Sequence, residues 1–319
     1  MNDPVAAYIS GIRLGAAQIH ENLTLIPLLC EAEVPLEYVT LDEAMRLKLV
    51  EITEVGEAGS VPDLKVLNRS RSKILIIDGE ELVGAKQNRI SNASFLIPEE
   101  SEKVIPVSCI EAGRWRWASK SFGSSDSMYA LMGRRSKLQS TTSFLRAKRE
   151  YRSDQGEVWG TVARYLGSSG TFSPTDSFVD YHEKRKADLA AFVAAFSSEA
   201  DQVGVMILIN GQLQGMDTFG KRITWRGVFP KLVRSYAMDA IVRMAIEPAA
   251  GGGALLSPEG FLRAVAEAPR QAFDSVGEGK DFRIETDEVI GAALVLNESL
   301  LHLTAFPKSP VPSRKPAAV

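Results

Sequence analysis

The stretch Lys73-Ile74-Leu75-Ile76-Ile77-Asp78-Gly79, residues 73–79, decides how the first third of the chain is expected to fold. Its apolar run is short and ends at Asp and Gly, which fits a buried strand better than a helix. Residues 23–29 form a similar run, and residues 50–55 alternate between apolar and polar side chains. The first 110 residues therefore predict mainly strands, interrupted by a short helix near residues 40–47 that Thr40 or Asp42 would cap.

The middle of the chain changes character. Residues 126–166 lack strand alternation and carry many basic side chains, so they predict helix. Ser173 before Pro174 predicts the start of another helix, which would run to about residue 196. Residues 205–212 again predict a strand. A helix follows from about residue 226 to 247, because its apolar residues recur at i, i+3, i+4 and i+7.

The end of the chain completes an α+β pattern. Ser257-Pro258-Glu259 predicts a short helix, and residues 291–306 predict further strand. We expect a β-rich N-terminal half and a C-terminal β-unit that share one sheet system, with amphipathic helices packed against it. This would be one domain over residues 1–306, or two β-units, 1–120 and 200–306, joined by helices 126–196. Residues 307–319 hold four prolines and predict a disordered tail.

Two segments of the chain resemble each other. Residues 74–80 and 206–212 each have four apolar residues, then Asp-Gly or Asn-Gly, then Glu or Gln. Such dipeptides favour tight hairpin turns. The segments are either two unrelated hairpins or the two copies of a duplicated β-unit that face one another across a site.

Composition excludes several classes of protein. The 37 Lys and Arg against 40 Asp and Glu give a net charge of -3, so no global positive field would hold DNA or an anionic membrane. The two cysteines, Cys30 and Cys109, exclude a disulfide scaffold and a four-cysteine zinc site. The N-terminus shows no signal peptide, and apolar runs of about seven residues are too short to span a membrane. We expect a cytoplasmic protein.

The richest polar stretch is residues 78–89. If it is a strand, Lys86 and Asn88 share one sheet face, and Gln87 and Arg89 share the other. Lys and Arg are suited to phosphate, and the two amides are suited to a sugar or base. Glu80 and Glu81 beside them could hold a cation or act as a general base. The alternative is a solvated β-edge with mixed charges.

Residues 105–117 form a second candidate stretch. We expect residues 104–111 to be the next strand and to pair with residues 78–89, which would bring Glu80 or Glu81 within side-chain reach of Glu111 or Arg114. Cys109 and Glu111 would share a strand face, and a neighbouring carboxylate is a poor setting for a reactive thiolate. Arg114 and Trp115 could clamp a base or ribose phosphate, although a tryptophan packed under a loop would show the same pattern. The three histidines have neither HExxH nor paired spacing, which argues against zinc. A Mg²⁺ held by carboxylates and phosphate needs little signature and stays open.

Two further groups of charges have ambiguous roles. A basic run lies within residues 134–152, where few acidic residues oppose it. Because no aromatic residues interleave it at stacking spacing, we predict a solvated face or an anion-binding wall and no relevant nucleic-acid binding. In the helix from residue 226, Asp239 and Arg243 could pair, or Arg234 and Asp239 could reach a ligand.

Several of these blocks together resemble a known family. They are residues 79–89, 105–111 with Gly113-Arg114-Trp115, 153–159, and 232–240. They are similar to the bacterial ARG and rhodanese-phosphatase-superfamily-associated protein domain, in which ARG stands for ADP-ribosylglycohydrolase. The resemblance extends to about residue 306. It implies genomic association with enzymes of ADP-ribose and phosphoester metabolism and carries over no catalytic residue.

The hypothesis from residues and resemblance is a protein that binds or processes a nucleotide-like phosphorylated ligand, ADP-ribose being the best candidate. If it is an enzyme, it is a hydrolase. Its catalytic residues would be Glu80, Glu81 and Glu111, and its ligand-binding residues would be Lys86, Gln87, Asn88, Arg89, Arg114, Trp115, Glu157 and Arg234. The alternative is a non-catalytic module in which Trp115, Trp117 and Trp159 contact a partner enzyme or a second copy.

Overall fold

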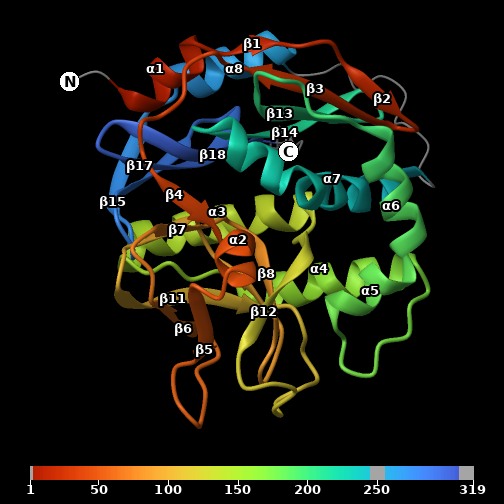
Figure 1. Ribbon diagram of the computed structural model, residues 1–319. Helices are drawn as coiled ribbons and strands as arrows, with labels where there is room; N and C mark the ends of the chain where they lie inside the picture. The colour runs from red at the N-terminus through yellow and green to blue at the C-terminus, as the bar shows by residue number, and fades with distance from the viewer. Residues whose placement is uncertain (1–2, 245–255, 309–319) are drawn as a thin grey trace, which may run out of the picture.

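A nine-stranded antiparallel sheet dominates the described part of the chain, residues 3–244 and 256–308 of a computed structural model (Figure 1). Three N-terminal strands meet six C-terminal strands in it, with β3 paired to β13. The strands are β1 (Arg13–Leu14), β2 (Gln18–His20), β3 (Leu23–Leu29), β13 (Gln202–Ile209), β14 (Gln212–Phe219), β15 (Arg270–Asp274), β16 (Lys280–Glu285), β17 (Val289–Leu296) and β18 (Ser299–Pro307).

The remaining strands form two smaller sheets; in Figure 1 the six-stranded one lies in the lower half, and β4 and β7 of the other lie near the middle of the molecule. One has six strands in the order β12-β8-β9-β11-β6-β5, and the other has the order β10-β7-β4. β5 and β12, at opposite edges of the six-stranded sheet, contact each other, so this sheet curls. Its strands are β5 (Val50–Glu54), β6 (Asp63–Asn68), β8 (Glu80–Gly84), β9 (Arg89–Ser91), β11 (Ser101–Cys109) and β12 (Phe122–Met128); the smaller sheet has β4 (Tyr38–Thr40), β7 (Lys73–Ile76) and β10 (Phe95–Ile97).

The helices lie in layers around the large sheet. In Figure 1 the helices lie above the large sheet, between it and the lower sheets, and along the right and lower right of the molecule. The upper pair is α1 (Pro4–Ser10) and α8 (Pro258–Glu267), the middle pair is α3 (Leu131–Lys148) and α7 (Arg222–Met244), the side helices are α4 (Gln155–Ser168), α5 (Phe178–Lys184) and α6 (Lys186–Ala195), and the short α2 (Leu41–Arg46) lies by β4.

The α+β class and the sharing of one sheet by the two ends of the chain are confirmed, although β4 to β12 form sheets of their own. Local signals located several elements well. Ser257 caps α8 through its side chain, and Thr40 caps α2. α7 begins four residues before its expected start, and its expected end lies outside the described residues. The tail expected from residue 307 also lies outside them, except Pro307 and Lys308.

Three expectations were wrong. Residues 126–128 belong to strand β12, not to a helix. The helix expected from Ser173 begins at Phe178, because the Ser173 hydroxyl accepts the amide of Ser177 in the preceding turn. The pair of similar segments does not form two hairpins: β13 and β14 pair around Asn210-Gly211, whereas β7 pairs with β4 and β10 and leads into β8 of another sheet.

The Asn210-Gly211 turn gives a test of the hairpin. Both residues have positive φ, 51° and 72°, as a two-residue turn of this kind requires. Gly211→Ala should lower the free energy of unfolding by about 1 kcal/mol, because a Cβ disfavours this backbone region. Gly160→Ala in α4 is the matched control: beyond its chain neighbours and the backbone of its own helix, no atom of the described residues lies within 4 Å of the added Cβ, so it should stabilise by up to about 1 kcal/mol. Urea unfolding would measure the change in the free energy of unfolding for each variant. Changes of the same sign would contradict the turn assignment.

Candidate functional site

Several polar side chains meet at one end of the curled six-stranded sheet. Glu54 ends β5, Arg89 begins β9 and Cys109 ends β11, and Arg89 and Cys109 are paired across neighbouring strands. Lys86 lies in the turn between β8 and β9, and Trp115 follows β11. We call these five residues the mouth site. Ligand pockets often form at the mouths of curled sheets, because loops from several strands converge there.

The turn over residues 85–88 replaces the strand expected there. β8 ends at Gly84 and β9 begins at Arg89, so the expected division of Lys86 to Arg89 between two sheet faces is wrong. The polar run is instead a hairpin turn. Its backbone is fixed from both sides: the Lys86 amide donates to Glu54 Oε1 at 3.3 Å, and the Asn88 amide donates to Glu111 Oε2 at 3.1 Å.

Arg89 is the central cation of the mouth site. Its side chain is fully buried, and its Nη1 donates to Gln87 Oε1 at 2.9 Å. Its Nε and Nη2 have no hydrogen-bond partner in the described part of the chain. The Trp115 ring lies 5.6 Å from its guanidinium carbon. Burial lowers the pKa of Arg89, since the charged form is poorly solvated there, and an anion would restore the lost solvation.

Lys86 and Trp115 form the outer part of the mouth site, and Trp117 lies beside them. The ammonium donates to the carbonyls of Glu57 and Ala58, at 2.5 and 2.7 Å, and lies 5.5 Å from the Trp115 ring and 5.0 Å from the Trp117 ring. The two indoles are 46% and 51% exposed. A surface hollow of about 460 Å³ lies beside Trp117 and is lined by residues 117–120. Exposed indoles next to cations are suited to stacking on an aromatic ligand.

Glu111 and Arg114 hold the turn in place. The guanidinium forks onto both Glu111 oxygens, at 2.9 and 2.7 Å, and also donates to Ala85 O and Asn88 Oδ1. Burial alone would raise the pKa of Glu111, but Arg114, Thr175 and the Asn88 amide lower it overall. The lowered pKa makes Glu111 a weak general base. The strand that leads to it, β11, pairs with β9 as expected.

Cys109 is a buried thiol at the inner side of the mouth. Burial raises its pKa to about 11, and the neighbouring Arg89 offsets only part of this effect. Gln155 holds its backbone, accepting from the amide and donating to the carbonyl at 2.8 Å each. The thiol is therefore protonated near neutral pH, which suits a packing role better than a nucleophile.

Glu80 and Glu81 lie at the other end of β8, which corrects the expected juxtaposition with Glu111 and Arg114. Glu80 contacts Lys231 of α7, with 3.4 Å between Oε1 and Nζ. Burial raises its pKa to about 7. Glu81 is buried on the opposite sheet face, 3.1 Å from His182 Nε2, a contact without hydrogen-bond geometry. Sequence reasoning missed both partners, because nothing in the spacing links them to β8.

Glu157 and Arg234 occupy two further places. Glu157 accepts from the Ser136 hydroxyl at 2.7 Å on the exposed side of α4. Arg234 donates to the Asp126 carbonyl at 2.7 Å. The structure thus brings together Glu111, Arg114, Trp115 and residues 86–89. It places Glu80, Glu81, Glu157 and Arg234 elsewhere.

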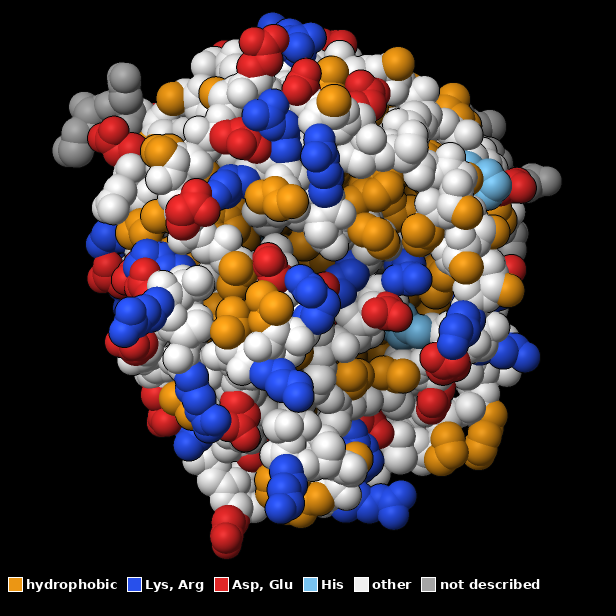
Figure 2. Space-filling model, in the orientation of Figure 1, with side chains coloured by type: hydrophobic (Ala, Val, Ile, Leu, Met, Phe, Trp, Pro, Cys, Tyr) orange, Lys and Arg blue, Asp and Glu red, His pale blue; other side chains and the backbone are white. Residues whose placement is uncertain are grey.

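The basic run is not a continuous surface stripe. Arg134 and Lys137 are buried and pair with Asp217 and Asp78, and Arg146 pairs with a carboxylate of β16. On the face in Figure 2, basic and acidic side chains are interleaved. Nucleic-acid binding relies on an extended positive surface, and the absence of such binding stays a prediction.

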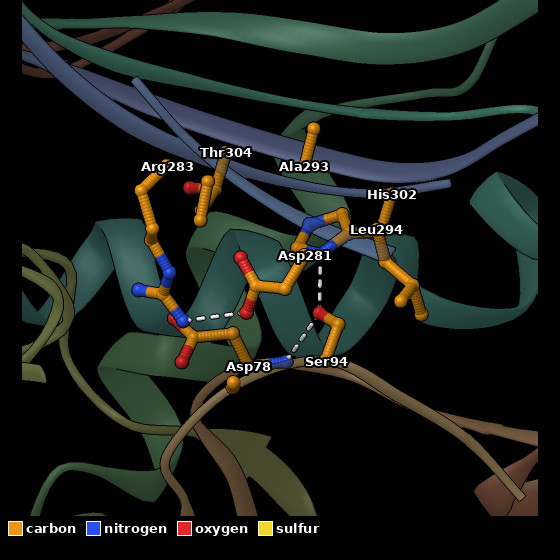
Figure 3. Close-up of a pocket in the computed structure, with 10 residues that line it drawn as sticks. Asp78, Ser94, Asp281, Arg283, Ala293, Leu294, His302 and Thr304 are labelled. Atoms are coloured by element: carbon orange, nitrogen blue, oxygen red, sulfur yellow. Dashed lines mark hydrogen bonds and ion pairs between the residues drawn. The ribbon is translucent and has the colours of Figure 1, made fainter. Parts of the chain in front are cut away.

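A small polar chamber lies between residues of the lower sheets and the large sheet (Figure 3). Its volume is about 10 Å³, the space of roughly one water molecule. Asp78 and Ser94 enter from below, and side chains of β16 to β18 enter from the large sheet. The lining residues are Asp78, Ala93, Ser94, Asp281, Arg283, Ala292, Ala293, Leu294, His302 and Thr304.

The chamber contains the residue types of a nucleophile, base and acid relay. Ser94 Oγ lies 2.7 Å from His302 Nδ1, and His302 Nε2 lies 3.3 Å from Asp217 Oδ1. Asp217 also receives a bidentate Arg134, at 2.9 and 2.5 Å, and the Tyr236 hydroxyl. All five side chains are buried, and the chamber has no room for a substrate. We therefore assign this network to stability. It escaped sequence reasoning because its members come from distant elements.

The described residues contain neither a cluster of metal ligands nor a helix that could span a membrane. Within residues 3–244 and 256–308, no group of three or more His, Cys, Asp or Glu is arranged to hold a metal ion. The same residues contain no helix that is both long enough and apolar enough to cross a bilayer.

Comparison with known proteins gives one match. Curated proteins and solved structures provide none. The matching sequence family is described as the ARG and Rhodanese-Phosphatase-superfamily-associated Protein domain, and its model covers residues 11–306. These residues include the mouth site, the polar chamber and nearly all of the described elements. The chain therefore belongs to the ARG and Rhodanese-Phosphatase-superfamily-associated Protein domain family.

Proposed function

We propose that the mouth site binds a nucleotide-like phosphorylated ligand, with ADP-ribose as the best candidate. Phosphate oxygens would accept from Arg89 and Lys86, and a base would stack on Trp115 or Trp117. The observation that carries this proposal is the buried Arg89 guanidinium, whose Nε and Nη2 have no partner within the described residues. A buried unpaired cation is costly, and an anion offers the missing partners.

A sugar would find an acceptor in the same place. Glu54 Oε1 is used by the Lys86 amide, while Oε2 is buried and has no hydrogen-bond partner within the described residues. A ribose hydroxyl donating to Oε2 would satisfy it. Glu54 was not among the residues selected from sequence. The family's association with the ARG and rhodanese-phosphatase superfamilies fits a phosphate- or nucleotide-related role in general terms.

An interaction module is the second candidate function. Trp115 and Trp117 are both about half exposed, and Trp159 on α4 is 39% exposed. Exposed indoles of this kind are common in protein interfaces. The convergence of the buried charges of Arg89, Lys86 and Glu54 next to Trp115 favours a small ligand, because a protein partner would not require buried charges.

Substitution of Arg89 tests the proposal. Quenching of tryptophan fluorescence by ADP-ribose should give a saturable curve in the wild type. Arg89→Met should raise the dissociation constant about 10- to 100-fold, because it removes charge-assisted hydrogen bonds and keeps an unbranched side chain of similar length. Trp159→Phe, outside the mouth site, should leave the constant unchanged. Thermal melting of each variant would show that it is folded.

Two results would speak against this function. The first is an absence of saturable quenching by ADP-ribose, ADP or AMP. The second is an Arg89→Met variant that binds as tightly as the wild type. Retained self-association or partner capture that is lost in Trp115→Ala would instead favour the interaction module.

A further inference from the structure

A second surface pocket lies between α2, β4 and the start of α7. Its volume is about 490 Å³. Its lining includes Asp42, Glu43 and Arg46 of α2, Thr224 and Arg226 of α7, and Tyr38 of β4. Figure 2 shows acidic and basic side chains close together on this face of the molecule. We call this the Asp42 pocket. It is separate from the mouth site, which lies at the other end of β8.

Behind the pocket, a buried lysine joins two carboxylates. Lys231 Nζ lies 2.6 Å from Asp42 Oδ1, 2.8 Å from Ser124 Oγ and 3.4 Å from Glu80 Oε1. Ser124 also donates to Asp42 Oδ1, at 2.5 Å. Lys231 and Glu80 are buried, while the Asp42 side chain is 35% exposed. Asp42 is therefore the member of this cluster that a ligand can reach.

The partners of Asp42 and Arg46 indicate which ligand would fit. Lys231 and Ser124 both contact the Asp42 carboxylate at Oδ1, and Oδ2 accepts no hydrogen bond from any described residue. Arg46 is exposed and has neither an ion pair nor a hydrogen bond within the described residues. Oδ2 suits a hydroxyl donor, and a free guanidinium suits a phosphate or carboxylate. Ile223, exposed at the rim, offers an apolar surface for the carbon skeleton.

We propose that the Asp42 pocket is a second binding site, for a hydroxylated anion such as a sugar phosphate, whose affinity is set by Glu80 through Lys231. The sugar hydroxyl donates to Asp42 Oδ2, and the phosphate pairs with Arg46. When Glu80 is neutral, Lys231 neutralises Asp42 alone. When Glu80 is ionised, the two carboxylates share one ammonium and the pocket becomes more negative, which disfavours an anion.

The sign of the pH effect follows from the groups around Glu80. Those that face it are Lys231, Asp42 and the Ile77 amide, which donates to Glu80 Oε2 at 2.8 Å. Burial raises the pKa of Glu80 to about 7 despite the attraction of Lys231. The affinity should therefore fall as pH rises from 6 to 8. At a separation of about 6 Å in water, one added charge weakens anion binding about threefold.

Calorimetric titration with D-ribose 5-phosphate tests the proposal. The titration uses an Arg89→Met background, in which the mouth site is disabled. Binding at the Asp42 pocket is then tested independently of binding at the mouth site. We expect binding to one site, loss of at least about tenfold in affinity in Asp42→Asn and in Arg46→Met, and a pH dependence that Glu80→Gln flattens by about threefold. The phosphate titrates near pH 6 itself, so only the difference between Glu80→Gln and its parent is used.

The other outcomes are decisive in the opposite direction. Undetectable binding of ribose 5-phosphate, or binding that survives both Asp42→Asn and Arg46→Met, would overturn the assignment of the pocket. A pH profile that is identical in Glu80→Gln would overturn the coupling through Lys231. Ribose and inorganic phosphate, titrated separately, should each bind at least about tenfold more weakly, because each uses one half of the pocket. Arg46 is exposed, so its variant keeps the test valid if Asp42→Asn unfolds the protein.

Discussion

Arg134→Met should lower the free energy of unfolding by about 3–5 kcal/mol, the largest effect we expect from a single substitution. Arg134 forks onto Asp217 in a fully buried position. Burial alone would raise the pKa of Asp217, but Arg134 and His302 lower it overall. Without the guanidinium, a carboxylate remains buried with no full countercharge. Urea unfolding with analysis of midpoint and slope would measure the loss.

Matched variants separate this effect from a loss of packing. Arg134→Met combined with Asp217→Asn should cost clearly less than the two single changes added together, because the second change removes the stranded charge. Arg152→Met breaks an exposed pair with Glu150 and should change stability by less than about 0.5 kcal/mol. A loss of free energy of unfolding below about 1 kcal/mol for Arg134→Met would contradict a stabilising role for the buried ion pair between Arg134 and Asp217.

The second large effect concerns pH. Glu80 has a pKa of about 7 in the folded protein, against 4.5 for an ordinary glutamate, because burial penalises its charge. Between these two values the folded state binds more protons than the unfolded state, so this group's stabilising contribution falls as pH rises from about 4.5 to 7. Over the whole window it should amount to about 3 kcal/mol.

Glu80→Gln isolates that contribution. A glutamine cannot ionise, so the variant should lose less stability than the wild type between pH 5 and pH 7.5. The subtraction is necessary because burial also raises the pKa of Asp239, to about 6, which adds a slope of the same sign. Parallel stability curves for wild type and Glu80→Gln would contradict a raised pKa at this position.

Local sequence signals predicted much of the fold. Ser257 before Pro258 located α8, and the apolar run at residues 23–29 located β3, because capping and burial depend on neighbouring residues. The hairpin predicted at Asp78-Gly79 was wrong, whereas the one predicted at Asn210-Gly211 was confirmed. Gly79 has a φ of 81° as a turn would require, but the chain crosses there from one sheet to another. The dipeptide therefore predicts that the chain bends, but pairing between distant segments decides which strand the next one joins.

The candidate site was predictable in part for the same reason. The 86–89 turn, Glu111, Arg114 and Trp115 meet because β9 and β11 are neighbouring strands, which sequence order favours. Lys231, Asp42 and Glu80 come from three elements whose packing no local pattern encodes. The burial of Arg134 was also not predictable from local sequence. The basic run that contains it was expected to form a solvated face or an anion-binding wall, but the fold buries Arg134.

The pairing of β3 with β13 has a consequence for how the protein is made. β3 leaves the ribosome as an apolar strand whose partner begins only at Gln202. At roughly 5–20 residues per second, it waits about ten seconds or more for that partner. Its neighbours in the meantime are short, β1 with two residues and β2 with three. An unpaired apolar strand is prone to aggregation during this interval, and pairings of such sequence separation make folding slow even in a purified sample.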